Sequence, residues 1–341
     1  MKSATCASAS ACALTAQGAR PSAPGAVDLR ATGLMAVLCL VWSLQQISLK
    51  AAAPQASPML MVGLRSLIAV VLLAALMVRR GEVPQRVRWK AGAVVGALFG
   101  LEYLLVTAAL GLTQASHVIV FLYTAPIFAA LGLAARLAPE RLGAKQWSGI
   151  ALAFGGIAVA FLGGVGSGGA DFTARGLAGD ALALLAGAAW GATTVTIRCT
   201  TLAGAPATET LLYQLLGAIT LLLPLAALTG RWRFEPSALT WTHLAFQSLI
   251  VSFASFLTWC WLLRRYLASQ LGVFSFLTPL IGVALGVWLL GERLETRFIT
   301  GGCLVLAGIA LVSSGAGSTP ARAAAHQAAG ARTAPRARAR W

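Results

Sequence analysis

Two charged side chains lie inside apolar segments of this sequence. Arg65 stands in "GLRSLIAVVLLAAL", about seven residues into an apolar run that begins near residue 58, and Glu102 stands in "FGLEYLLV", about eleven residues into the next run. A guanidinium can hold a carboxylate through paired hydrogen bonds. A carboxylate in such a place can bind a cation or take up a proton. Both residues are therefore candidates for binding a small charged molecule, and a fixed structural role for each is the alternative.

Polar residues also share one face of two segments that match each other at a separation of 148 residues. Each segment carries an aromatic residue, two polar residues and a cation at equal spacing: Trp42, Gln45, Gln46 and Lys50 in "WSLQQISLK", and Trp190, Thr193, Thr194 and Arg198 in "WGATTVTIR". Polar faces avoid lipid because an unpartnered polar group costs several kcal/mol there. We expect these faces to line a cavity or to form hydrogen bonds between helices. For the two cations, the simpler interpretation is that they extend to the membrane interface.

The sequence lacks the common motifs of metal-dependent, serine-triad and nucleotide-hydrolysing enzymes. It has three histidines and contains no H-E-x-x-H, no G-x-S-x-G and no G-x-x-x-x-G-K-[ST] motif. The spacing of its six cysteines is not typical of a disulfide framework or a zinc site. We therefore predict no catalytic residue, metal or cofactor, and a membrane-embedded enzyme becomes the weaker alternative.

Composition indicates where these residues must lie. The 341 residues are 58% hydrophobic and 11% charged, whereas a soluble domain carries about 25% charged residues. Because a helix needs about 20 apolar residues to cross a bilayer, the chain predicts an all-α integral membrane protein with ten transmembrane helices. The predicted spans are 31–51, 58–78, 91–112, 115–136, 145–164, 179–198, 208–228, 240–263, 267–290 and 297–316. Residues 1–30 and 317–341 are predicted to be disordered tails.

Positive charge predicts the orientation of these helices. Nineteen Lys and Arg residues fall on the side of the two tails and six on the other side, with Arg65 inside a span. Basic residues collect on the cytoplasmic side of membrane proteins. We expect a multi-pass protein of the inner (cytoplasmic) membrane with both termini cytoplasmic. Its net charge of +16 then needs no nucleic acid partner, and the basic tail can contact anionic lipids.

The spans form an internal repeat. "PERLGAKQWSGIALAFGGIA" and "GERLETRFITGGCLVLAGIA" match at a separation of 152 residues, and "VFLYTAP" upstream matches "VFSFLTP". The two halves, 31–165 and 176–316, each contain five spans, so the second half enters the membrane from the opposite side. Inverted repeats of this kind build secondary transporters with a substrate site near the membrane midplane. A channel is the further alternative.

These paired segments, the tryptophan followed by a cation and Arg65 resemble the EamA-type drug/metabolite transporter superfamily over residues 31 to 316. The resemblance implies a central cavity built mainly by helices 1 to 4 and 6 to 9, with helices 5 and 10 at the periphery. It implies export of small polar metabolites such as amino acids or their analogues, with a multidrug or cation exporter as the alternative. The expected partners are a small-molecule substrate and membrane lipids, and proton coupling and the oligomeric state stay open.

The repeat adds further candidates. Gln214 is the approximate counterpart of Arg65, and Tyr123 is a candidate for the cavity wall. Pro126 and its counterpart Pro279 are predicted mid-helix, where proline removes a backbone hydrogen bond and kinks the helix, so both are candidate hinges. Glutamates Glu140 and Glu292 are expected to begin the helices that follow and to stabilise their N-termini. Six glycines in the fifth and tenth spans are expected to allow close helix contact: Gly149, Gly155, Gly156, Gly301, Gly302 and Gly308.

Overall fold

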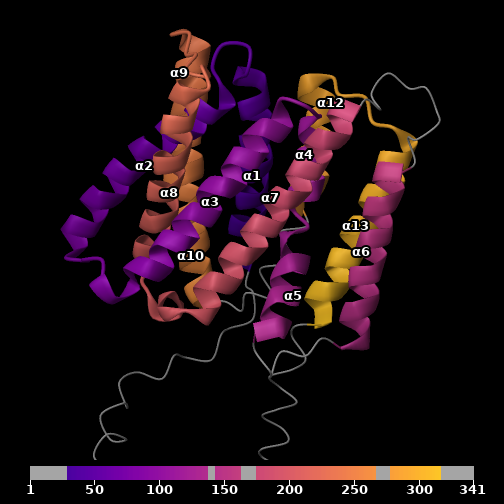
Figure 1. The fold of residues 1–341 in the computed structure, drawn as a ribbon, viewed down its shortest axis with the longest axis horizontal. Coiled ribbons are helices and arrows are strands. Elements are labelled where there is room, and N and C mark those ends of the chain that lie inside the picture. Colours follow the sequence, from indigo (N-terminus) through magenta and orange to yellow (C-terminus); the bar gives the residue numbers. More distant parts are fainter. Residues whose placement is uncertain (1–28, 137–142, 163–173, 266–276, 316–341) are drawn as a thin grey trace, which may run out of the picture.

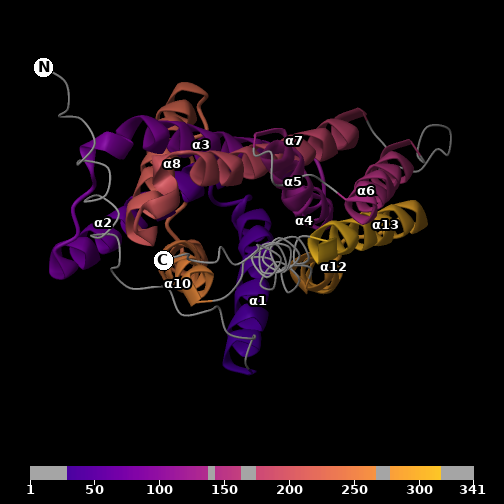
Figure 2. The same cartoon turned by 90° about the horizontal axis from the view of Figure 1, so that it is seen from below.

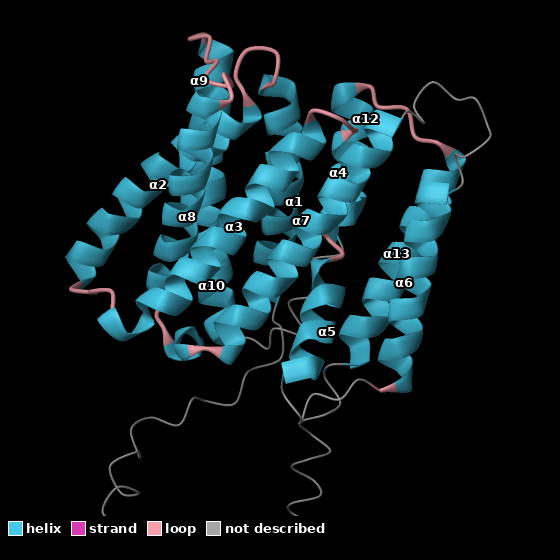
Figure 3. Ribbon diagram, in the orientation of Figure 1, coloured by secondary structure: helices cyan, strands magenta, loops and turns pink. Residues whose placement is uncertain are grey.

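The first repeat folds into helices at each predicted span. The computed structural model describes residues 29–136, 143–162, 174–265 and 277–315, which are helices joined by loops (Figures 1 and 3). Long apolar runs rich in Ala and Leu, which are strong helix formers, favour this outcome. The helices of the first repeat are α1 (Leu29–Ala52), α2 (Pro58–Arg80), α3 (Trp89–Leu110), α4 (Ala115–Leu122), α5 (Ala125–Arg136) and α6 (Ala144–Leu162).

The second repeat follows the same plan. Its helices are α7 (Ala174–Cys199), α8 (Ala207–Leu228), α9 (Ala238–Ala245), α10 (Phe256–Arg265), α12 (Leu277–Leu290) and α13 (Thr296–Gly315), with a π-helical segment, η3 (Phe246–Ser255), that joins α9 to α10. Within the described ranges, six helical segments are long and apolar enough to cross a membrane. The prediction of an all-α, multi-pass membrane fold is confirmed. Residues 1–28 of the first predicted tail, the whole second predicted tail and the start of the ninth span, 267–276, lie outside the described residues, and residues 29 and 30 already belong to α1.

The last helices of the two repeats pack against each other at one edge of the molecule. Figures 1 and 2 both show α6 beside α13. A Cβ atom added at Gly156 would lie 2.6 Å from the carbonyl oxygen of Gly301, and one at Gly308 would lie 2.5 Å from that of Gly149. These two contacts are equivalent under the repeat, and such reciprocity is what a twofold relation between the halves requires. The expected glycine packing is confirmed at these four positions.

The fourth span differs from its prediction because it is interrupted. Residues 115–136 do not form one kinked helix: α4 ends at Leu122 and α5 begins at Ala125. Pro126 is the second residue of α5, a position where the missing proline N–H leaves no helical hydrogen bond unmade. Its counterpart Pro279 is the third described residue of α12, and residues 266–276 before it lie outside the described residues. The mid-helix placement was wrong for Pro126 and stays a prediction for Pro279, as does the role of both prolines as hinges.

Candidate functional site

Arg65 is buried within the helix assembly. The second turn of α2 places it there, and only 1% of its surface is exposed. One terminal nitrogen donates a 2.5 Å hydrogen bond to Oε1 of Gln247 in η3. The guanidinium carbon lies 4.4 Å from the ring centroid of Tyr103 in α3, a cation–π contact. Arg65 therefore joins the second span to the third and the eighth, and both of these contacts are with neutral side chains.

Gln247 and Tyr103 extend this contact to the first span. Nε2 of Gln247 donates to the backbone carbonyl of Gln45 at 2.8 Å, and Nε2 of Gln45 donates to the Tyr103 hydroxyl at 3.0 Å. All four side chains are buried. We call Gln45, Arg65, Tyr103 and Gln247 the central polar cluster. It connects α1, α2 and α3 of the first repeat to η3 of the second, which places it between the repeats.

Glu102 precedes Tyr103 in α3 and is 5% exposed. Within the part of the chain that the structure describes, no ion pair of 4.0 Å or less includes Glu102, and its Oε2 atom is buried without a hydrogen-bond partner. A buried carboxyl oxygen without a partner retains the ability to accept a hydrogen bond from a donor.

Two other polar atoms, one in the cluster and one on the residue that follows Gln45, share this property. In the described ranges, Oε1 of Gln46 and Nε of Arg65 are also buried without a hydrogen-bond partner. Buried polar groups in proteins are nearly always satisfied by protein or by bound molecules. The three atoms include both donor and acceptor character.

The predicted aromatic residues contact other aromatic rings within the protein. Trp42 donates from Nε1 to Oγ of Ser255 at 3.1 Å, and its ring packs edge-on against Trp259 with centroids 5.4 Å apart. Trp190 packs edge-on against Tyr123 with centroids 5.2 Å apart. Both tryptophans are partly buried. Each therefore faces neighbouring helices over at least part of its surface.

Three other candidates make no contact with the cluster that the structure records. The hydroxyls of Thr193 and Thr194 donate to carbonyls of their own helix, those of Ala189 and Trp190. Gln214 in α8 is partly buried, with no hydrogen bond to another described residue. The polar face of α7 is thus satisfied within its helix, unlike the face of α1, whose Gln45 reaches across to α3.

Gln247 and Tyr103 are the members of the cluster that sequence reasoning missed. Both stand in apolar runs, and Tyr103 directly follows Glu102. A signal was present in "FQSLIVSFAS", where successive buried polar residues are one, four and three positions apart: Gln247, Ser248, Ser252 and Ser255. This spacing marks one face of a helix. The described residues contain no group of three His, Cys, Asp or Glu side chains that could hold a metal ion.

Comparison with known proteins finds a matching family, similar sequences and a similar fold. The sequence profile of the EamA-like transporter family matches residues 30–162 and 177–314. A "Probable amino-acid metabolite efflux pump" of Salmonella typhimurium is 27% identical over 82% of this chain and 94% of its own length. An "Uncharacterized transporter" of Archaeoglobus fulgidus is also 27% identical, over 82% of this chain and 96% of its own. A solved crystal structure shares the fold with a TM-score of 0.57 at 21% identity, over 87% of this chain and 99% of its own.

Proposed function

The chain belongs to the EamA-like transporter family, and on this premise we propose that it is a secondary carrier that exports small polar metabolites from the cytoplasm. Amino acids and their analogues are the first substrate class to test. The relative described as a probable amino-acid metabolite efflux pump supports this choice. The inverted repeat supports alternating access as the transport mechanism, because repeats of this kind rock against each other around a central site.

The observation that carries the proposal is the neighbourhood of Arg65 and Glu102. Both are almost fully buried, and both hold a polar atom with no hydrogen-bond partner in the described ranges. Charged groups inside a membrane are costly and are usually kept for function. A guanidinium N–H matches the carboxylate of a zwitterion, and a carboxylate oxygen matches its ammonium group.

The same pair of charges argues against a purely cationic cargo. A cationic drug would gain from the carboxylate of Glu102 and would be repelled by the guanidinium of Arg65. A zwitterion has a complementary charge for each residue. Proton uptake by Glu102 during the cycle is part of the proposal, since an intramembrane carboxylate of this kind is a typical proton carrier.

The test is accumulation of radiolabelled substrates by inside-out membrane vesicles. The panel contains neutral, acidic and basic amino acids together with a lipophilic quaternary cation. We expect saturable accumulation of neutral amino acids, with the Glu235→Gln variant equal to wild type because Glu235 is exposed in a loop. Accumulation of the cation alone would replace this proposal with the cation exporter, and accumulation of none of the panel would contradict both.

A further inference from the structure

Residues 111–117, which are the turn between α3 and α4 together with the first residues of α4, are bonded both to the first span and to the second repeat. We refer to these residues as the turn 111–117. Nζ of Lys50, at the end of α1, donates to the carbonyl of Leu110 at 2.5 Å and to that of Thr113 at 2.7 Å. These carbonyls are at the C-terminal end of α3, where a cation is stabilised by the helix dipole. Lys50 is therefore not simply extended to the interface, as its sequence position suggested.

Glu292, in the loop between α12 and α13, holds the other side of the same turn. Its two carboxylate oxygens accept hydrogen bonds from the backbone N–H groups of Ala115 and Ser116, at 2.5 and 3.0 Å. These groups begin α4, so a residue of the second repeat caps a helix of the first. The sequence predicted that Glu292 would begin its own helix, but α13 starts only at Thr296. Its counterpart Glu140 lies outside the described residues.

Asp180 of α7 makes a third contact with the turn. Its Oδ1 atom accepts from the Thr113 hydroxyl at 2.6 Å, and its carboxylate lies 3.0 Å from Nδ1 of His117. The His117 ring stacks on Phe298 of α13 with centroids 3.8 Å apart. The turn is thus bonded to two separate elements of the second repeat. We call Lys50, Asp180 and Glu292, with the turn that they hold, the outer clasp.

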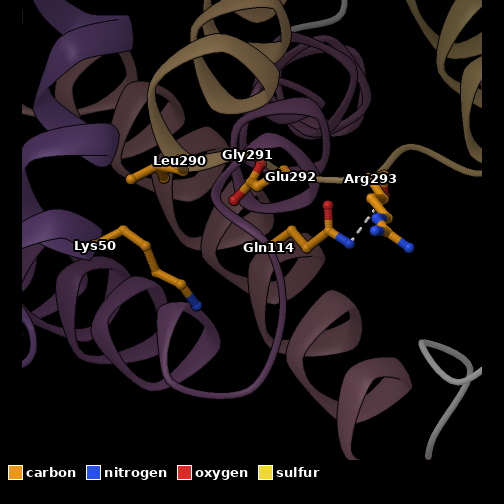
Figure 4. A pocket seen from close by; sticks show the side chains of 6 residues that line it. All are labelled: Lys50, Gln114, Leu290, Gly291, Glu292 and Arg293. Atoms are coloured by element: carbon orange, nitrogen blue, oxygen red, sulfur yellow. Dashed lines mark hydrogen bonds between the residues drawn. The ribbon is translucent and has the colours of Figure 1, made fainter.

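A pocket lies next to the outer clasp at the seam, which is the contact between the first and second repeats. Its volume is about 400 Å³, and Figure 4 shows that the residues around it come from α1, from the turn, from the end of α12 and from the loop that follows. Across this seam, Nε2 of Gln114 donates to the carbonyl of Arg293 at 3.1 Å. The lining residues are Lys50, Gln114, Leu290, Gly291, Glu292 and Arg293.

Among the described residues, Lys50 and its counterpart in the second repeat are bonded differently. Arg198 takes the place of Lys50 in the second repeat, at the opposite face. It is exposed, and it forms no hydrogen bond or ion pair with another described residue. Lys50 is partly buried and bonded twice. In a carrier built from inverted repeats, equivalent contacts form at the two faces in turn and not together. The bonds of Lys50 are therefore those expected when its own face of the carrier is closed.

We infer that the outer clasp is the gate that closes the face opposite the termini, and that it must release the turn 111–117 before substrate can leave. This inference rests on the proposed alternating-access carrier. The bonds that open are those of Lys50 to the end of α3, of Glu292 to the start of α4 and of Asp180 to Thr113 and His117. They are polar and at the surface end of the helices, where water replaces them when they separate.

A cysteine beneath the clasp measures its opening without any substrate. Ser116 is fully buried, and its Oγ atom has no hydrogen-bond partner among the described residues, so Ser116→Cys removes no bond that the structure records. The full chain would carry this change with its six native cysteines replaced. The rate of labelling by a membrane-impermeant maleimide is then measured on intact cells and on inside-out vesicles.

We expect Asp180→Asn and Lys50→Met each to raise labelling from outside by at least about tenfold, as the loss of hydrogen bonds to a charged group allows. The control Glu235→Gln removes an exposed acid elsewhere and should label as the parent does. Lys50→Met decides the result if the Asp180 variant is not folded by size-exclusion chromatography. Unchanged labelling in a folded variant, or faster labelling only in inside-out vesicles, would overturn the gate. Because labelling needs no cargo, a wrong substrate class leaves this result interpretable.

Discussion

At the scale of single residues, Glu102 is the side chain whose environment is least explained by structure alone. It is 5% exposed, and its Oε2 atom has no partner in the described ranges. A residue kept only to position helices would be expected to form the bonds that hold them. Arg65 does form such bonds, to Gln247 and Tyr103. Arg65 therefore has a part in positioning the helices. The Oε2 atom of Glu102 has no such part, and it can accept a ligand or a proton.

We predict that Glu102→Gln lowers the initial rate of export at least about tenfold, because a hydrogen bond to a charged group is worth about 1.5–3 kcal/mol. The amide keeps the shape and removes the ionisable group, so the variant should also lose the dependence of export on pH. Rates are measured at matched membrane expression, with Glu235→Gln as the exposed control. A wild-type rate and pH profile in the variant would refute the role of Glu102 in transport.

Tyr103 separates two contributions to the central polar cluster. Tyr103→Phe removes only the acceptor of Gln45 and should cost about 1 kcal/mol of stability. Tyr103→Leu also removes the ring beneath Arg65, a contact worth about 2 kcal/mol when desolvated. Thermal unfolding in detergent should therefore rank the melting temperatures as wild type, Phe and then Leu. Equal melting temperatures for the Phe and Leu variants would show that the ring contact contributes nothing.

At the scale of elements, the crossing of α6 and α13 depends on particular glycines. A Cβ at Gly156 would lie within 2.8 Å of atoms of Gly301, Leu304 and Val305, whereas one at Gly155 would have no atom within 4 Å. We predict that Gly156→Ala destabilises the protein by about 1–3 kcal/mol, the usual cost of overpacking. Gly155→Ala is the matched control and should not lower the melting temperature. A similar loss in both variants would mean that helix contact is not the cause.

Most of the element boundaries could be predicted from the sequence, because long apolar runs flanked by charge specify where helices begin and end. The break between α4 and α5 could not, since proline is compatible both with a kinked helix and with the start of a new one. The capping role of Glu292 was also hidden. It caps α4, which is more than 170 residues away in sequence, and no local pattern reports such a contact.

The sequence predicted some residues of the central site but not the contacts between them, because these contacts also join residues far apart in the sequence. The positions of Arg65 and Glu102 were evident from their charge in apolar surroundings, and the face of Gln45 and Gln46 from its period. Which partners they meet depends on how four separate spans pack. Gln247 bonds to Arg65 across 182 residues of sequence. Its polarity in an apolar run could mark it as a candidate, but the sequence could not identify Arg65 as its partner.

At the scale of the whole molecule, the distribution of charge should determine how the chain sits in the membrane. With 19 of the basic residues on the side of the tails, we predict that both termini are cytoplasmic. Alkaline phosphatase fused to the C-terminus should be inactive, and a fluorescent protein fused there should fluoresce. An active phosphatase fusion would reverse the orientation, and with it the direction assigned to the outer clasp.

The central claim is that two inverted halves carry a small zwitterion through alternating access at a site that contains Arg65 and Glu102. Counterflow tests it most directly. Proteoliposomes are loaded with an unlabelled neutral amino acid, and uptake of the labelled compound is followed over time. We expect a transient, saturable accumulation above equilibrium in wild type and in Glu235→Gln, and its loss in Arg65→Gln and Glu102→Gln. Passive equilibration without overshoot, or a full overshoot in both site variants, would contradict it.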